Sequence, residues 1–179
     1  TRVRSSAASD VYKRQGVNAG AIGANAQAKG ANSIAIGVSS YAKEDSSMAL
    51  GTNANASGAS STAIAINAQA VGANSLAAGV GAQAIGVNST AFAFEATANG
   101  DDAVALGVAA TANGISAMAF GTDSLASGNK ATAIAAGSRA TGINAISIGV
   151  NSLANGSNAQ SFGVGAEATG TNAVAIASN

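Results

Sequence analysis

Residues 30–43 read GANSIAIGVSSYAK, and this 14-residue phrase decides the fold. From Gly16 onward the pattern of this phrase repeats eleven times without insertion or deletion, and a twelfth, incomplete copy follows. The repeats begin at Gly16, Gly30, Glu44, Gly58, Gly72, Gly86, Gly100, Gly114, Gly128, Gly142, Gly156 and Gly170. A fixed period of this kind predicts a stack of identical structural units, each packed on its neighbours.

The columns of the repeat, numbered here as positions 1 to 14, indicate two short strands. Small residues at positions 4, 6 and 8 alternate with larger ones at 5, 7 and 9, which is the period of a strand with two different faces. Positions 11 and 13 are small on either side of a variable position 12, so a second strand is expected there. Gly at position 1, and usually at position 8, marks turns between the strands.

These strands predict an all-β fold, because fourteen residues are too few for a helical hairpin repeat and Gly, Ser and Asn disfavour helix. We expect the small faces of the two strands to meet inside a flattened coil. Successive coils would then pair as parallel strands about 4.8 Å apart. The sequence therefore predicts a narrow parallel β-solenoid of about 12 coils with 14 residues per coil.

Position 7 is apolar in every repeat and suggests a homo-oligomer. A thin Ala and Ser interior buries little apolar surface, and the 5, 7 and 9 face would form an exposed apolar stripe along the rod. We therefore expect position 7 to pack around the axis of a homotrimer. The predicted trimer-interface residues are Ile22, Ile36, Leu50, Ile64, Phe92, Leu106, Phe120, Ile134, Ile148, Phe162 and Ile176. The alternation also fits the reverse arrangement, in which position 7 points into its own coil and the small residues line the interface.

Composition argues against an enzyme and against a cofactor or metal. The chain has no Cys and no His, so it lacks disulfides, zinc ligands and the usual catalytic bases. The acidic pairs Glu44/Asp45 and Asp101/Asp102 lie four coils apart, about 19 Å, which is too far for two carboxylates that share one glycosidic bond. We interpret these pairs as solvated turn charges, and Asp does not recur at fixed positions as a calcium β-roll requires.

Charge excludes a nucleic-acid partner. Residues 16–179 carry four basic and seven acidic side chains, a formal charge of −3, and no basic stripe. We also expect no membrane contact by this segment.

The first fifteen residues, TRVRSSAASDVYKRQ, lack the period. We expect 1–15 to be an assembly scar or a disordered leader outside the fold. Residues 16–179 form the repeat domain, and because Asn179 falls at position 10 of a repeat we expect this domain to be truncated at its C-terminus.

The repeats resemble the head repeats (Hep/Hag repeats) of YadA-like trimeric autotransporter adhesins. The resemblance is carried by NSIAIG (32–37), NSTAFA (88–93), NAISIG (144–149) and NAVAIA (172–177), each led by Gly two residues earlier. It implies a left-handed parallel β-roll in a homotrimer on the bacterial cell surface, and a role in virulence. It further implies binding to an extracellular matrix protein such as collagen or to a host cell surface. The stalk and outer-membrane anchor of such proteins are not in this sequence.

The repeats depart from this pattern at two columns. Glu44 replaces the leading Gly, and Ala replaces the Gly of position 8 at Ala65, Ala93, Ala135 and Ala177. These departures put the local turn geometry in doubt rather than the fold.

The expected function is an adhesive, non-catalytic head segment. The candidate ligand contacts occupy position 12, the predicted outward face of the second strand: Tyr41, Gln69, Gln83, Leu125, Arg139 and Leu153. A phage tail-fibre or structural fibre segment is the alternative. An ice-binding solenoid is less favoured, because the Thr column of Thr97 and Thr111 is broken by Leu125.

Overall fold

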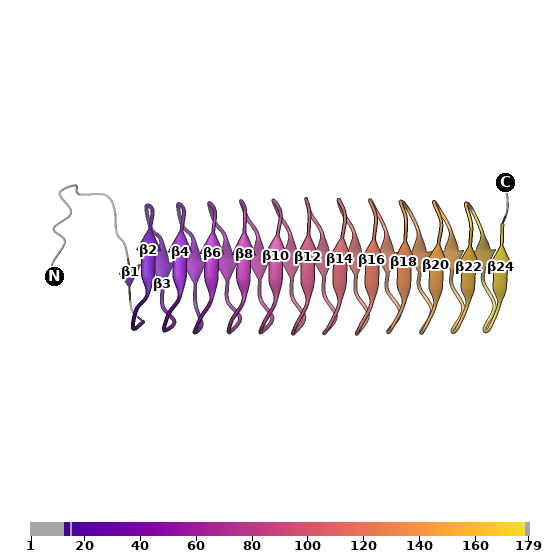
Figure 1. The fold of residues 1–179 in the computed structure, drawn as a ribbon, viewed down its shortest axis with the longest axis horizontal. Coiled ribbons are helices and arrows are strands. Elements are labelled where there is room, and N and C mark those ends of the chain that lie inside the picture. Colours follow the sequence, from indigo (N-terminus) through magenta and orange to yellow (C-terminus); the bar gives the residue numbers. More distant parts are fainter. Residues whose placement is uncertain (1–12, 15, 178–179) are drawn as a thin grey trace.

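The chain forms a straight rod of stacked coils (Figure 1). The computed structural model describes residues 13–14 and 16–177. Within them, every complete repeat contributes a three-residue strand at positions 5–7 and a two-residue strand at positions 12–13. The two kinds of strand form two parallel 12-stranded sheets, so the predicted all-β solenoid with 14 residues per coil is confirmed.

The first sheet, in front in Figure 1, consists of β2 (Gly20–Ile22), β4 (Ile34–Ile36), β6 (Met48–Leu50), β8 (Thr62–Ile64), β10 (Leu76–Ala78), β12 (Thr90–Phe92), β14 (Val104–Leu106), β16 (Met118–Phe120), β18 (Thr132–Ile134), β20 (Ile146–Ile148), β22 (Gln160–Phe162) and β24 (Val174–Ile176). The second sheet consists of β1 (Lys13–Arg14), β3 (Gln27–Ala28), β5 (Tyr41–Ala42), β7 (Asn55–Ala56), β9 (Gln69–Ala70), β11 (Gln83–Ala84), β13 (Thr97–Ala98), β15 (Thr111–Ala112), β17 (Leu125–Ala126), β19 (Arg139–Ala140), β21 (Leu153–Ala154) and β23 (Glu167–Ala168).

The register between coils follows the sequence period. Each strand residue pairs with the residue fourteen positions later, as in Ile34 with Met48 and Ala35 with Ala49. Because no repeat carries an insertion, equivalent side chains stack in columns along the rod. Each outward-facing position of the repeat therefore forms one line of side chains along the surface of the rod.

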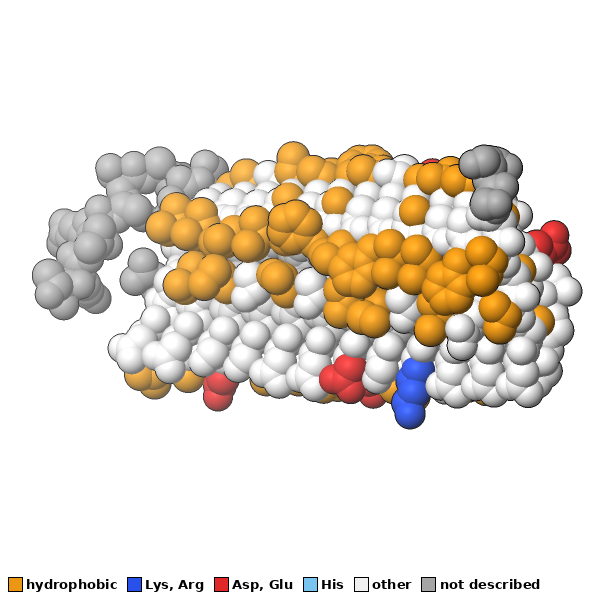
Figure 2. All heavy atoms as spheres, turned by 45° about the vertical axis from the view of Figure 1, so that its right-hand side comes forward, with side chains coloured by type: hydrophobic (Ala, Val, Ile, Leu, Met, Phe, Trp, Pro, Cys, Tyr) orange, Lys and Arg blue, Asp and Glu red, His pale blue; other side chains and the backbone are white. Residues whose placement is uncertain are grey.

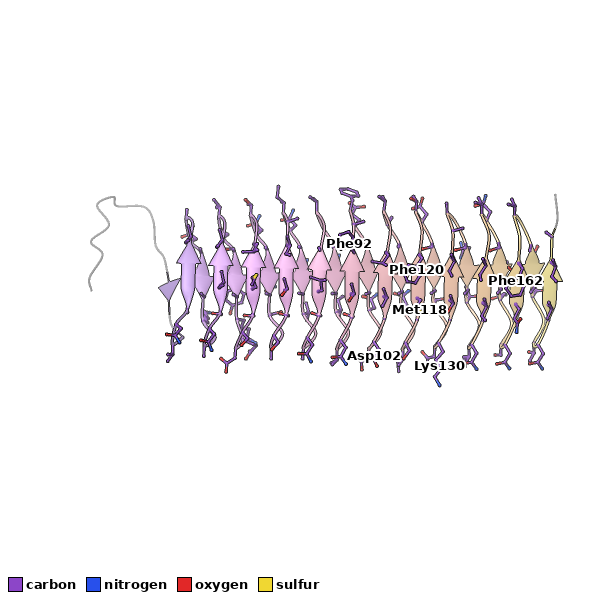
Figure 3. All side chains as sticks on the ribbon, viewed as in Figure 1. Phe92, Asp102, Met118, Phe120, Lys130 and Phe162 are labelled. Carbon is purple, nitrogen blue, oxygen red and sulfur yellow. The ribbon has the colours of Figure 1, made fainter. Side chains whose placement is uncertain are left out.

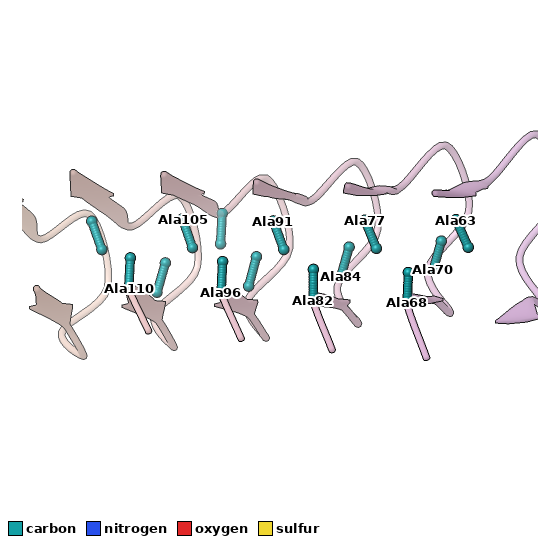
Figure 4. Close-up of a cluster of buried hydrophobic side chains, with 14 of the residues drawn as sticks. Ala63, Ala68, Ala70, Ala77, Ala82, Ala84, Ala91, Ala96, Ala105 and Ala110 are labelled. Atoms are coloured by element: carbon teal, nitrogen blue, oxygen red, sulfur yellow. The ribbon is translucent and has the colours of Figure 1, made fainter. Parts of the chain in front are cut away.

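The interior of the coil is built from methyl-sized side chains. Positions 4, 6, 11 and 13 are buried, and Ala63, Ala77 and Ala91 of the first sheet face Ala68, Ala82 and Ala96 across the coil (Figure 4). This confirms that the two small faces meet inside. Most buried serines fit the same columns because their hydroxyls donate to turn carbonyls, as Ser33 Oγ does to the Gly30 oxygen at 2.7 Å.

The first strand is shorter than the alternation indicated. Position 8 is not a further inward residue of that strand. It opens the turn, with a φ of 129° at Gly37, because the chain must reverse within a few residues of the strand end. The smallness of this column reflects backbone conformation, since a positive φ favours glycine.

Alanine adopts the same turn where it replaces that glycine. Ala65 and Ala135 have a φ of 101° and Ala93 has a φ of 118°. The turn geometry is therefore kept at these three positions, and each alanine holds a conformation that costs about 1–3 kcal/mol.

Two turns join the strands of each coil. In one, the position 4 amide donates to the position 1 carbonyl, as Ser33 does to Gly30 at 3.3 Å. In the other, the position 11 amide donates to the position 8 carbonyl, as Ser40 does to Gly37 at 3.3 Å. The residues at positions 3 and 10 are left-handed, with a φ of 56° at Asn32, which Asn, Asp and Ser tolerate.

Position 1 needs glycine because successive coils approach closely there. A Cβ added at Gly100 would overlap the carbonyl oxygen of Gly114 in the next coil. Most equivalent glycines face the same carbonyl, and Glu44 is the exception in this column.

Parallel pairing begins before the first repeat. Lys13 and Arg14 form β1 and pair with Gln27 and Ala28, in the repeat register, although we assigned them to the leader. Residues 1–12 and 15 of that leader lie outside the described residues. The boundary at Gly16 stays a prediction.

Candidate binding and assembly surfaces

The outer face of the first sheet carries an apolar stripe along the rod (Figure 2). Position 7 points away from the coil interior, since Ile22 is 57% and Phe92 54% exposed while Ala21 and Ala91 before them are buried. The reverse arrangement, with position 7 inside its own coil, is therefore wrong. An exposed apolar patch of this extent is typical of an interaction surface.

All eleven residues predicted for a trimer interface lie on this stripe. Phe92, Phe120 and Phe162 project from its strands, and Met118 at position 5 widens it (Figure 3). The isoleucines of the set are exposed, whereas Leu50, Leu106, Phe120 and Phe162 are half-buried. Their role in a trimer stays a prediction.

Position 9 extends the apolar surface onto the neighbouring turn. The exposed residues there are Val38, Ile66, Val80, Phe94, Val108, Val150 and Val164. This turn edge of the rod is therefore apolar over much of its length.

The outer face of the second sheet is more polar. All six predicted ligand contacts project from it, since position 12 lies between the buried residues of positions 11 and 13. Gln69 and Arg139 are exposed, and the other four are half-buried. Lys29 Nζ lies 3.1 Å from Tyr41 Oη and 4.8 Å from the centre of its ring, so a cation covers part of the tyrosine. Whether these residues touch a ligand stays a prediction.

Side-chain amides form ladders along the turn of positions 1–4. Asn74 donates to Asn88 at 3.2 Å, and Asn88 donates to Asp102 at 3.0 Å in the following coil. Similar bonds join Asn18 to Asn32, Asn144 to Asn158 and Asn158 to Asn172. Stacked polar residues at position 3 therefore form side-chain ladders that link successive coils.

Sequence reasoning missed a second use of polar residues at this turn. Asp45 Oδ1 accepts a bond of 2.7 Å from the Ala31 amide, and Asn129 Oδ1 accepts one of 3.1 Å from the Ile115 amide. Asp or Asn occupies position 2 in only three coils, and in each the oxygen reaches the position 2 amide of the coil before. Three residues of the acidic pairs are exposed and Glu44 is half-buried, and one member of each pair accepts a hydrogen bond from a backbone amide.

One ion pair joins side chains within the described part of the chain. Lys43 Nζ lies 3.0 Å from Glu44 Oε1, and the hydrogen bond to Glu44, followed by its charge, raises the pKa of Lys43. Both groups are solvated, so the pair contributes little to stability.

Residues 13–14 and 16–177 hold no group of three or more acidic, His or Cys side chains placed to bind a metal ion. Over the same residues, no helix is long and apolar enough to cross a membrane.

The family model described as the YadA head domain repeat matches residues 15–40, 42–64, 70–92, 98–124, 112–134, 140–159 and 161–176. These matches cover well over half of the chain. This chain belongs to the YadA head repeat family. The family is an adhesin repeat, a non-enzymatic structural type, which agrees with the absence of His and Cys.

A solved structure supports the membership. The collagen-binding domain of the Yersinia adhesin YadA matches this head repeat chain with a TM-score of 0.56 and 25% identity, over 91% of this chain and 82% of that one. Collagen binding is a property of that Yersinia domain. The comparison with curated protein sequences gave no match.

Proposed function

We propose that this chain is an adhesive head segment that works as a homotrimer on a bacterial surface. Three rods pack side by side with their first sheets around a common axis, and position 7 forms the apolar centre. The observation that supports this proposal is the apolar stripe that position 7 forms along the outer face of the first sheet. Full burial of one large apolar side chain, such as the Ile, Leu or Phe found at position 7 of most coils, contributes about 1.5–3 kcal/mol, which the Ala interior cannot supply.

This assembly turns the second sheets outward. Three copies then present the position 12 column, and each copy offers weak contacts along the rod. Such contacts sum when several engage one extended ligand, so modest single-site affinity gives firm attachment. The Tyr41, Arg139 and Leu153 side chains supply the aromatic, charged and apolar contacts of this face.

The proposed ligand is an extracellular matrix protein of the collagen type. The match to a collagen-binding head supports this choice. A fibrous ligand could also contact many coils of the long repetitive face at once. Anchorage in the outer membrane would come from parts of the protein other than this head. A phage tail-fibre or structural fibre segment is the second candidate and shares the trimer but not the ligand.

The assembly is tested by light scattering on the purified chain. We expect a trimer mass for the wild type and a lower mass for the double variant I134D/I148D, which places charge on the stripe. Q69D/Q83D is the control, since it adds the same two negative charges to position 12 of adjacent coils on the second sheet. A wild-type mass of one chain at all concentrations would overturn the proposal.

Binding is tested with the verified trimer on surfaces coated with collagen, fibronectin or laminin. We expect saturable collagen binding that falls at least about tenfold in Y41A/R139A/L153A. Thr97→Ala with Thr111→Ala is the matched control, because both residues occupy position 12 in coils without a predicted contact. A trimer that binds no matrix protein or host cell surface would favour the fibre alternative.

A further inference from the structure

The coil of residues 86–99 carries exposed apolar side chains on both of its turns. Phe94, at position 9, is 50% exposed on one turn. Val87, at position 2, is 43% exposed on the other, and Ile85 just before it is 42% exposed. The two turns form opposite edges of the flattened rod, and β12 separates them (Figure 1). Phe94 therefore cannot cover Val87 within one chain.

These residues are unusual in their columns. Phe94 is the sole aromatic residue at position 9. Position 14 is apolar only at Val71 and Ile85, because the other complete repeats have Lys, Ser, Asn or Thr there. The aromatic residue of one edge and the apolar cluster of the other edge thus fall in the same part of the rod.

Their heights along the rod also agree. Phe94 and Val87 are seven residues apart, which is half a coil, or about 2.4 Å along the axis. Val80, the position 9 residue of the preceding coil, lies the same half-coil on the other side of Val87. A neighbouring rod at the same height would place Val87 between Val80 and Phe94.

We propose that Phe94 of one copy packs against Ile85 and Val87 of the next copy around the trimer axis. The inference rests on the proposed trimer. With three parallel rods in register, the position 8–11 turn of each chain meets the position 1–4 turn of its neighbour, and the contact closes after three copies. The partner is a second copy of this chain.

Charge complementarity supports the same pairing of edges. Asp123 at position 10 and Lys130 at position 3 are exposed on opposite turns and are again half a coil apart. Neither takes part in an ion pair within the described residues. Lys130 and Asp102 mark the lower turn in Figure 3. Two pairs are unfavourable, because Glu95 lies half a coil from Asp102 and Phe94 lies half a coil from Asp101.

The contact opposes an axial slip of the three chains in one direction. Position 7 alone repeats with little variation, so a slip by one coil would still bury apolar side chains. Such a slip toward the C-terminus would move Phe94 from its place between Val87 and Asp101 to one between Asp101 and Ile115, where it loses the Ile85 and Val87 surface. A slip of one coil toward the N-terminus would place Phe94 between Ala73 and Val87 and would keep the Val87 contact.

Cysteine cross-linking tests the contact, since the chain has no Cys of its own. In F94C/V87C, each copy offers one thiol to each neighbour. Oxidation, or a short bis-maleimide, should close a covalent trimer that appears on a denaturing gel and, when disulfide-linked, disappears on reduction. The single variants cannot close a ring. F94C/I143C is the matched control, with a position 2 thiol four coils away.

The outcomes separate this contact from the proposed function. A covalent trimer in F94C/V87C alone supports the contact. A trimer mass without cross-linking, or with equal cross-linking in the control, overturns the contact and leaves the trimer standing. A monomer mass overturns both. As an independent readout, D123K should lower the melting temperature of the trimer, and D123K/K130D should recover it. No recovery would contradict the pairing of edges.

Discussion

The backbone amide of Val87 donates a hydrogen bond of 2.8 Å to Asp101 Oδ1, fourteen residues later. The bond links two successive coils outside the sheets, at a turn where the position 2 amide faces solvent. It also gives the Asp101 carboxylate a structural role at this turn. Its value can be measured directly.

Replacing Asp101 by Ala should destabilise the rod by about 0.5–1.5 kcal/mol, because the Val87 amide loses its acceptor. For a chain of this length, that corresponds to a fall of about 1–6 °C in melting temperature. Asp101→Asn keeps the oxygen and should retain most of the stability. Glu167→Ala is the control, because this carboxylate is exposed and makes no hydrogen bond or ion pair among the described residues. Equal losses in D101A and E167A would show that the bond contributes nothing.

Glycine at the strained alanines of position 8 should stabilise the protein. Ala93→Gly relieves a φ of 118°, and we expect a gain of about 1 kcal/mol, seen as a higher denaturant midpoint. Ala136→Gly is the control, because Ala136 follows a strained alanine but has no positive φ of its own. It should lose about 0.4–1 kcal/mol by making the unfolded chain more flexible. A loss in both variants would contradict the strain.

The position 1 column should not tolerate alanine. In Gly100→Ala the new methyl would overlap the Gly114 carbonyl, so the two coils must separate, at a cost of about 1–3 kcal/mol or more. Gly20→Ala, at position 5 of β2, places its methyl in open space and should be neutral or slightly stabilising. Thermal unfolding of the two variants at one protein concentration checks this contrast. Similar melting temperatures would show that the stack relaxes around the methyl.

The repeat period predicted most of the fold, because register, stacking and the small interior all follow from columns of equal residues. The turn at position 8 was predicted correctly, but the alternation also counted this position as an inward residue of the first strand, because a small residue serves either a buried face or a positive φ. Asp45 and Asp101 accept hydrogen bonds from backbone amides, but acidic residues do not recur at this position in every repeat. The sequence period therefore did not reveal these bonds, which are seen only in the folded turn. The direction of position 7 required the structure, since both parities fit the sequence.

For the assembly and ligand surfaces, the sequence predicted only which positions of the repeat face outward. Phe92 at position 7 and Arg139 at position 12 were placed on outward faces, and the structure puts them there. Which copy or ligand meets each face depends on distances between molecules. A single-chain pattern does not contain these distances.

Serines within the coil of residues 142–155 form a directional chain of hydrogen bonds. Ser152 Oγ donates to the Gly149 carbonyl at 2.8 Å, so its one hydrogen is used. Ser147 Oγ, 2.6 Å away, must then donate to Ser152. The two buried hydroxyls are therefore not equivalent, although both replace an interior Ala.

Removing them should have unequal effects. Ser152→Ala leaves the buried Ser147 hydroxyl without its acceptor and should cost about 1–3 kcal/mol. Ser147→Ala leaves the Ser152 donor bond intact and removes only the long contact of 3.4 Å to the Ser161 hydroxyl, so it should cost less than Ser152→Ala. The double variant should cost less than the sum of the two, because the Ser147 hydroxyl that Ser152→Ala strands is then absent. Denaturant unfolding of the four proteins measures this coupling, and strictly additive losses would mean that the two serines do not form one chain.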